Sequence, residues 1–236
     1  MTDSGKHSYG LDWLDENELF EITKKTFAKA LNPTKKKTAP PDPFTLVAYA
    51  VVTNNNLDEA RDFEAERAIN KTLSNEVGLW HQHVLGLADG WEDLGAAGGG
   101  VDLRSSLIDA RYNKPIIAEV KNRFNTIKAS DEKKLWDQLD MLARSTNSVA
   151  YVFQIVPEKC EQYDRPWNVS GREPRENVRC CDGVTAYNMV FKRKNALQEI
   201  YGVLPDIFSD VTGKATVIDK SASESLYYCS FPLSND

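Results

Sequence analysis

The chain has 236 residues, of which 41% are hydrophobic and 27% are charged, and its formal net charge at pH 7 is −6. This length can bury a substantial core, and the composition is ordinary for a globular protein. The longest apolar run, residues 44–52, is far shorter than the roughly 20 residues of a membrane span, so no membrane partner is expected. The acidic balance excludes a nonspecific nucleic-acid coat protein but leaves nucleic acid open as a substrate of one basic surface.

The N-terminal segment and the cysteines indicate the compartment. The segment has no apolar core of a signal peptide, so a cytoplasmic location is expected. The cysteines lack the CxxC spacing of zinc sites, and reduced structural thiols are therefore expected. They are Cys160, Cys180, Cys181 and Cys229.

The alternation of helical and extended patterns predicts one α/β domain over residues 1–236. Residues 1–14 are expected to be flexible. Asp15 and Glu18 then form a start signal for an amphipathic helix. That helix ends before residues 32–43, which have the composition of a proline- and lysine-rich loop.

The sequence FTLVAYAVV, residues 44–52, predicts a buried segment, and a long helix is predicted over residues 58–85. One apolar stripe recurs along this helix at steps of three and four residues. Its members are Leu73, Val77, Trp80, Val84 and Leu87. Extended backward, the stripe includes Glu66, and Glu76 lies at its edge. A glutamate on a buried stripe is costly unless it is paired or binds a metal.

Extended segments dominate the middle of the chain. Residues 90–100 are glycine-rich and predict a flexible connector, after which a strand begins at Val101. A returning strand is predicted over residues 116–121, followed by a helix over 130–144 and a buried strand over 148–157.

The last part of the chain starts with a polar, arginine-rich stretch over residues 158–183. Residues 184–191, VTAYNMVF, predict a strand, and residues 195–211 predict a helix. A short C-terminal strand is predicted over residues 226–231.

Asp102, Glu119 and Lys121 are the candidate catalytic residues. Side chains at positions i and i+2 of a strand share a face, so Glu119 and Lys121 point together. If the strand after Asp102 pairs with the returning strand, two carboxylates and an ammonium group converge. Such a cluster suits Mg²⁺, which prefers oxygen ligands, and the carbonyl of Val120 would add one. Lys121 would orient or deprotonate an attacking water, or stabilise charge on a phosphate.

A surface hairpin with a simple Glu-Lys pair is the alternative interpretation. Three features favour catalysis over it. The aspartate follows a glycine-rich entry, apolar residues surround Glu119, and the preceding helix carries Glu66 on its stripe.

Asp102 with Glu119-Val120-Lys121 resembles the PD-(D/E)xK nuclease signature, with Val101 in the place of proline. More of the chain resembles type II restriction endonucleases that cleave GGNCC or GGWCC sites. Most of the sequence beyond residue 64 takes part, and KNRFNT is the most specific match. The matching segments are NEVGLWHQHVLG, GGGVDLRS, EVKNRFNTIKASD, RPWNVSG and ALQEIYGVLPDIFSDV.

The resemblance implies Mg²⁺-dependent hydrolysis of phosphodiester bonds in double-stranded DNA at a short palindromic site. It implies a restriction-endonuclease-like fold, with a central mixed β-sheet flanked by α-helices, and usually a homodimer. Asp102 and Glu119 would hold the metal and Lys121 would act on the water. Glu66 would be a further carboxylate, with Glu76 as the reserve candidate. A cognate DNA methyltransferase in the host is implied as a functional partner.

Two polar groups of residues are candidates for DNA contact. The first follows the returning strand and offers amide, hydroxyl and cationic groups to phosphates. Its members are Asn122, Arg123, Asn125, Thr126 and Lys128. The second consists of Arg165, Arg172 and Arg175, because arginine commonly reads guanine through two hydrogen bonds. A polar turn and a salt-bridged loop are the respective alternatives.

Two other functions fit the same residues. A repair or recombination nuclease of the same superfamily would prefer branched or damaged DNA. A DNA-binding protein without chemistry would be indifferent to divalent metal, and the complete set of carboxylates and lysine counts against it.

Overall fold

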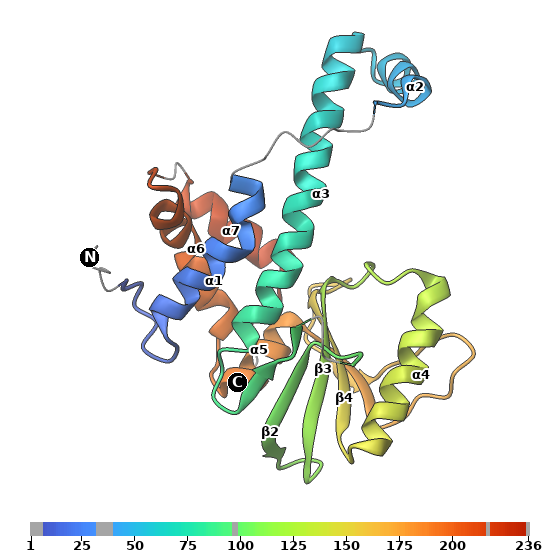
Figure 1. Cartoon of the computed structure of the whole chain (residues 1–236), viewed down its shortest axis with the longest axis vertical. Helices are drawn as coiled ribbons and strands as arrows, with labels where there is room; N and C mark the ends of the chain where they lie inside the picture. The colour runs from blue at the N-terminus through green and yellow to red at the C-terminus, as the bar shows by residue number, and fades with distance from the viewer. Residues whose placement is uncertain (1–6, 32–39, 96–98, 216–217, 235–236) are drawn as a thin grey trace.

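The computed structural model describes residues 7–31, 40–95, 99–215 and 218–234. Within these ranges, seven helices surround one six-stranded sheet (Figure 1). The helices are α1 (Glu16–Leu31), α2 (Pro43–Thr53), α3 (Leu57–Leu85), α4 (Ala129–Ser145), α5 (Gly183–Phe191), α6 (Ala196–Thr212) and α7 (Lys220–Ser230). The strands are β1 (Trp91–Asp93), β2 (Leu103–Asp109), β3 (Lys114–Arg123), β4 (Val149–Val156), β5 (Asp164–Pro166) and β6 (Val178–Asp182).

The sheet is mixed, with the strand order β1-β2-β3-β4-β6-β5. β3, β4 and β6 run parallel at its centre, and the strands on both sides pair antiparallel. Helix α4 connects β3 to β4, as parallel neighbours require a crossover. All five residues of β6 are buried, which is typical of parallel strands covered on both faces. The expected α/β fold with a central mixed sheet is confirmed.

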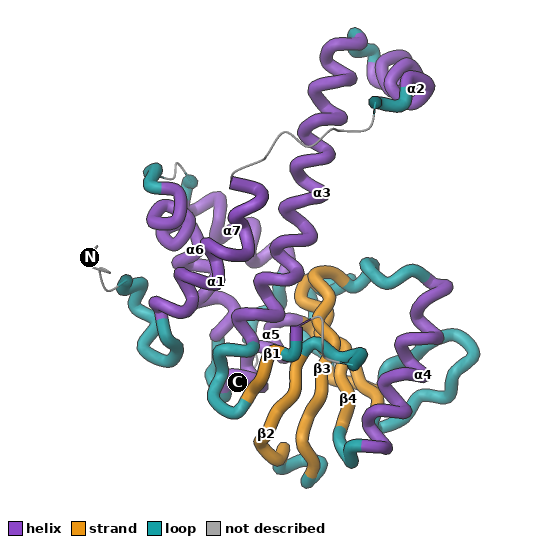
Figure 2. Tube along the Cα trace, in the orientation of Figure 1, coloured by secondary structure: helices purple, strands orange, loops and turns teal. Residues whose placement is uncertain are grey.

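Helices cover both faces of the sheet (Figure 2). Alternate residues of β4 point to opposite faces, so Tyr151 and Phe153 belong to one hydrophobic core and Ala150 and Val152 to another. The first core packs under α3 and α5, with α1 and α6 behind them. The second packs under α4.

Hydrogen-bonding side chains set the starts of the predicted helices. Asp15 Oδ1 accepts the backbone N–H groups of Asn17 and Glu18 at the start of α1. At the start of α3, Asn56 and Glu59 form a reciprocal capping box. The predicted long helix is therefore confirmed almost residue for residue.

Three of the predicted elements are wrong in type. The predicted strand over residues 184–191 is helix α5, whose first turn is capped by Asp182 accepting from Thr185. The predicted strand over residues 226–231 lies mainly in helix α7. Residues 91–93, assigned to a flexible connector, form edge strand β1. Short apolar runs do not distinguish a strand from a buried helix by periodicity.

The segment predicted to be buried, residues 44–52, is helix α2, and most of its side chains are exposed. Asp42 caps it by accepting the N–H of Phe44. Of the proline- and lysine-rich loop, residues 32–39 lie outside the described residues. At the N-terminus, residues 1–6 also lie outside them, and Leu11 is buried in the first core.

Gly183 provides a test of the junction between β6 and α5. A Cβ at this position would fall on the backbone carbonyl of Ile155 in β4, which cannot move aside easily. We expect Gly183→Ala to lower the free energy of unfolding by about 1–3 kcal/mol, the usual cost of overpacking. Urea denaturation followed by circular dichroism measures it.

The matched control is Gly202→Ala in helix α6, where a Cβ meets open space. Alanine there should raise stability by about 0.5–1 kcal/mol, because alanine is the better helix former. Equal stabilities of the two variants would contradict the tight junction.

Candidate functional site

Asp102 is fixed beside β3 by two hydrogen bonds. Its backbone N–H donates to Ala118 O at 2.9 Å, and its Oδ2 accepts the N–H of Val120 at 2.7 Å. The next residue, Leu103, then pairs in register with Ala118. The carboxylate therefore lies directly against the Glu119-Val120 backbone, and the two strands meet as the sequence pattern requires.

Glu119 and Lys121 extend from the same strand, and Lys121 Nζ donates to Glu119 Oε1 at 2.6 Å. Both side chains are partly buried. β3 is held between β2 and β4, with Glu119 opposite Val152 and Lys121 opposite Gln154. Two carboxylates and one ammonium group are thus brought together on a central strand.

The electrostatics of the acidic pair favour a positive ligand. Burial raises the pKa of Asp102, and the charge of Asp93 adds to this, against the opposing effects of the Val120 N–H and Lys121. Burial and the charge of Asp102 likewise raise the pKa of Glu119. Both carboxylates are therefore under-compensated when ionised, and a cation placed between them would stabilise the charged forms.

A hollow of about 330 Å³ opens beside this cluster, between α3 and the end of β3. The helix comes close because residue 78 is glycine, and a Cβ there would lie 3.4 Å from the Cβ of Asn122. The β3 side and its approach are lined by Asp102, Val120, Lys121, Asn122 and Thr126, and the α3 side by Ser74, Asn75, Gly78, Leu79 and Gln82.

Gln82 and Asp93 form a buried network next to Asp102 that the sequence patterns do not indicate. Gln82, only 7% exposed, donates to Asp93 Oδ1 at 2.7 Å, and His83 hydrogen-bonds to the other oxygen. Burial acts to raise the pKa of Asp93, but hydrogen bonds from His83, the Gly95 N–H and Gln82 outweigh it and lower the value. Asp93 therefore remains ionised and acts on Asp102 from the adjacent strand.

His81 has a different role from its neighbours. It is fully enclosed and its Nδ1 lies 2.7 Å from the hydroxyl of Tyr187. Burial lowers its pKa to about 3, so the ring is neutral at physiological pH. It is a structural residue of the first core.

Neither helix glutamate lies in the hollow. Glu66 is exposed, and the expectation that it lies on a buried stripe is wrong. It precedes Gly78 by twelve residues, about 18 Å along the helix axis. The stripe is uncovered there because α3 has left the body of the protein (Figure 1). Glu76 is partly buried but does not line the hollow, to which α3 contributes Asn75 and Gln82 instead.

Comparison with known proteins decides the family. A family model described as Eco47II restriction endonuclease matches residues 11–213. The type II restriction enzyme Eco47II of Escherichia coli is 32% identical over 214 residues, which cover 83% of this chain and 85% of the relative. The chain belongs to the Eco47II restriction endonuclease family.

A second restriction enzyme is similar to the chain at lower sequence identity. Sau96I of Staphylococcus aureus, a type II restriction enzyme, is 22% identical over 211 residues, covering 77% of this chain and 78% of the relative. No solved structure matches the chain significantly. Membership in the Eco47II family makes the chain an enzyme, a site-specific deoxyribonuclease, as the resemblance in sequence implies.

In this member of the family, the first group of expected DNA contacts lies at the mouth of the hollow. Asn122 and Thr126 line it, and the amide of Asn122 also donates to Ser74 O on α3. The other three are exposed: Arg123 is the last residue of β3, and Asn125 and Lys128 lie on the turn between β3 and α4.

The arginines of the second group are separated by their partners. Arg172 forms two hydrogen bonds of 2.6 Å with Asp137, and Arg175 pairs with Asp140, so both are attached to α4. Arg165 is exposed and lies over the ring of Tyr163, with 4.9 Å between the guanidinium carbon and the ring centroid.

Arg165 lines a second hollow of about 620 Å³ near the carboxyl end of β4. The wall is mostly polar, with Gln154 from β4 and Lys159 from the following loop among its members. Trp167 packs at its base, buried in the second core.

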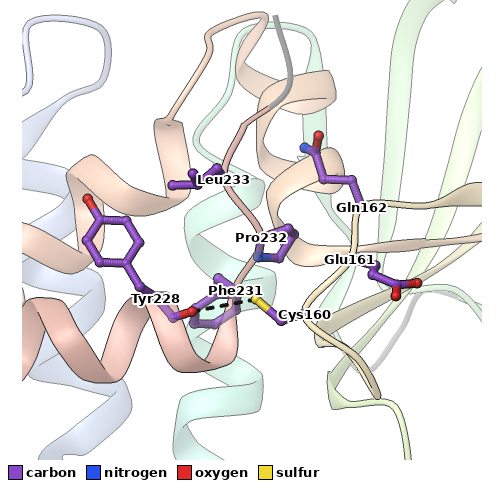
Figure 3. A pocket seen from close by; sticks show the side chains of 7 residues that line it. All are labelled: Cys160, Glu161, Gln162, Tyr228, Phe231, Pro232 and Leu233. Atoms are coloured by element: carbon purple, nitrogen blue, oxygen red, sulfur yellow. Dashed lines mark hydrogen bonds between the residues drawn. The ribbon is translucent and has the colours of Figure 1, made fainter.

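A third hollow, of about 760 Å³, is separate from the site: its lining residues do not include Asp102, Glu119 or Lys121 (Figure 3). It lies between the 160–162 loop and the segment that ends α7, and Cys160 Sγ donates to Tyr228 O across it. All four cysteines are free thiols, as expected from their spacing.

The donor set fits a divalent cation with few protein ligands. Among the described residues, no three His, Cys, Asp or Glu side chains converge as a ready metal site. Asp102, Glu119 and the Val120 carbonyl would therefore supply the protein oxygens, and water the rest. Mg²⁺ binds in this way, through one or two carboxylates and several waters. None of the described helices is long and apolar enough to cross a membrane.

The raised pKa values predict a pH dependence of stability. At pH values between the ordinary pKa of Glu119 in the unfolded chain and its raised pKa in the fold, the folded protein binds more protons than the unfolded chain does. Stability of the metal-free protein should therefore fall as pH rises through that window. Glu119→Gln should flatten this fall and leave the variant more stable than wild type at neutral pH, as measured by urea denaturation over a pH series.

Asp93→Asn is the control of opposite sign. The pKa of Asp93 is lowered in the fold, so its contribution is present above the unfolded pKa and is lost as pH falls through the folded one. This variant should be less stable than wild type at neutral pH. A stabilised Asp93→Asn, or a destabilised Glu119→Gln, would contradict the assigned environments.

Proposed function

We propose that this chain is a Mg²⁺-dependent type II restriction endonuclease that hydrolyses phosphodiester bonds of double-stranded DNA at a short palindromic, GGNCC-like site. Its activity class follows from the family; the metal, the site and the residue roles are the proposal. The observation that supports it best is that Asp102 and Lys121 line one hollow, with Glu119 hydrogen-bonded to Lys121 beside it.

The proposed metal ligands are Asp102, Glu119 and the Val120 carbonyl. When bound, Mg²⁺ would lower the pKa of a water and stabilise negative charge on the phosphate. The protein's part is to hold two ionised carboxylates close together, and the Val120 N–H does so for Asp102. The raised pKa values support this assignment, because they show that the ionised carboxylates have too little positive charge around them.

Lys121 is the proposed residue that acts on the attacking water. Its ammonium group donates to Glu119, and Lys121 lines the hollow. There it would orient the water, assist its deprotonation and stabilise charge on the phosphate in the transition state. The water oxygen forms a bond to phosphorus, one ester P–O bond breaks, and the leaving oxygen takes up a proton.

DNA would enter over the turn between β3 and α4. Asn122 and Thr126 would contact the scissile region, and the exposed Arg123, Asn125 and Lys128 would bind neighbouring phosphates. Of these five residues all but Asn122 are exposed, so their side chains are accessible to a duplex.

Bases would be read by the second group of candidates. Arg165 extends into the polar hollow, whereas Arg172 and Arg175 would have to exchange Asp137 and Asp140 for DNA. Arg165 is therefore the preferred candidate among the three for contact with guanine.

The biological setting follows from the same proposal. A palindromic site is matched by a two-fold symmetric enzyme, so we propose a homodimer. A cognate DNA methyltransferase would protect host DNA, and both would work in the cytoplasm. Glu66 is not included in the catalytic set because of its exposed position on α3.

Lys121→Ala tests the catalytic assignment. Wild-type protein with plasmid DNA and Mg²⁺ should give discrete fragments, and chelation of the metal should stop cutting. The variant should cut at least about 100-fold more slowly, the usual effect of losing a proton-transfer group. Its affinity for a duplex containing the site, measured by fluorescence anisotropy without Mg²⁺, should stay within a few-fold of wild type.

Lys114→Ala is the matched control, since Lys114 begins the same strand seven residues earlier and lies outside the hollow. It should cut as wild type does. Sequencing the fragment ends would give the site and the stagger. Random smearing, preference for branched DNA, or no cutting with any divalent ion would reject the proposed function.

A further inference from the structure

Helix α2 lies at the tip of α3, away from the sheet, and carries large apolar side chains into solvent (Figure 1). Phe44 and Val52 are each 84% exposed, Val51 is 76% exposed and Val47 is 51% exposed. Burying such side chains is worth about 1.5–3 kcal/mol each, so their exposure is a substantial cost.

The exposed residues form one continuous stripe. Phe44, Val47, Ala48, Val51 and Val52 follow the spacing i, i+3, i+4, i+7 and i+8, which places them on one side of the helix. We call these five residues the α2 stripe. Its spacing is that of a helix built to pack on a partner.

The opposite side of α2 is already occupied by α3. Leu46 and Ala50 are buried with Ala60 of α3, and the ring of Tyr49 stacks on Phe63 with centroids 4.5 Å apart. This small core is separate from the two cores of the sheet. Isolated helices of this length are marginal in water, and a pair joined by so small a core needs further packing.

The stripe carries no charge with which to hold an anionic partner. Helix α2 contains no charged residue, and residues 43–75, the arm, hold five acidic and three basic residues, a net charge of −2. Phosphates of DNA and anionic lipid headgroups would therefore find no cation on the stripe. At 11 residues, about 16 Å, α2 is also too short to span a membrane.

A second copy of this chain fits the stripe best. A two-fold interface pairs one surface patch with itself, which a wholly apolar stripe tolerates without placing like charges together. The five residues of the stripe carry no charged or polar group that would select one different protein over another.

We propose that the arm is the dimerisation element, with the α2 stripes of two copies packed about a two-fold axis. The two α2 helices would then pack against each other, each with its own α3 behind it. The inference rests on the proposed function for the need of a dimer, and it adds where the dimer forms. Residues 57–82 of α3 would link this interface to each catalytic hollow through about 38 Å of continuous helix.

The test is the solution mass of the full chain without DNA, by analytical ultracentrifugation over a wide concentration range. Wild type should sediment at twice the chain mass of 26.5 kDa. The double variant Val51→Lys, Val52→Lys should sediment at the chain mass, while circular dichroism shows an unchanged fold because both side chains are exposed.

The matched control is Ile108→Lys with Met141→Lys, which changes two side chains of similar exposure on the sheet and on α4. It should remain a dimer. A monomeric wild type, a dimeric α2 variant, or wild-type binding to phosphatidylglycerol vesicles that the α2 variant loses would overturn the inference. Cutting of plasmid DNA is assayed separately. If wild type is a dimer that fails to cut with Mg²⁺, the proposed function is rejected and dimerisation through the arm is not. If wild type is a monomer that cuts, dimerisation through the arm is rejected and the proposed function is not.

Discussion

The hydrogen bond from the Val120 N–H to Asp102 Oδ2, 2.7 Å long, is the interaction on which the site depends. It lies where the pairing of β2 with β3 begins, so the aspartate side chain occupies a backbone position of the ladder. If the carboxylate rotated away, the Val120 N–H would lose its hydrogen-bond partner. The proposed chemistry of Asp102, Glu119 and Lys121 would therefore take its geometry from the central sheet.

This arrangement lowers the stability of the metal-free fold. Burial and mutual repulsion oppose ionisation of Asp102 and Glu119, and Lys121 offsets only part of the cost. The surroundings do not neutralise the site further, because hydrogen bonds from His83, the Gly95 N–H and Gln82 keep Asp93 ionised, and it adds negative charge. The fold tolerates two carboxylates whose charge is incompletely compensated, and a bound cation would recover the stability that they cost. Functional sites commonly lower the stability of a fold in this way.

Sequence patterns predicted the elements whose signals are local. The apolar steps of three and four residues located α3, and the i, i+2 rule placed Glu119 and Lys121 together. The patterns were wrong where burial depends on distant neighbours. Residues 184–191 are mostly apolar, which suits a strand or a buried helix equally, and the cap at Asp182 decides for the helix. The Gln82–Asp93 hydrogen bond joins a helix to an edge strand, and the periodicity of neither segment could predict it.

The long helix explains both a failed expectation and an unexpected surface. Its apolar spacing continues past the point where the body of the protein ends, so extending the stripe to Glu66 assumed a covering layer that is absent there (Figure 1). Beyond that point, α3 is covered by α2 on one side, and α2 has nothing outside it among the described residues. One rigid element thus presents Asn75 and Gln82 to the catalytic hollow and an apolar helix to a partner. Because a helix transmits position without bending easily, the site of pairing would fix the distance between two catalytic centres, and hence the spacing of the two cuts in a duplex.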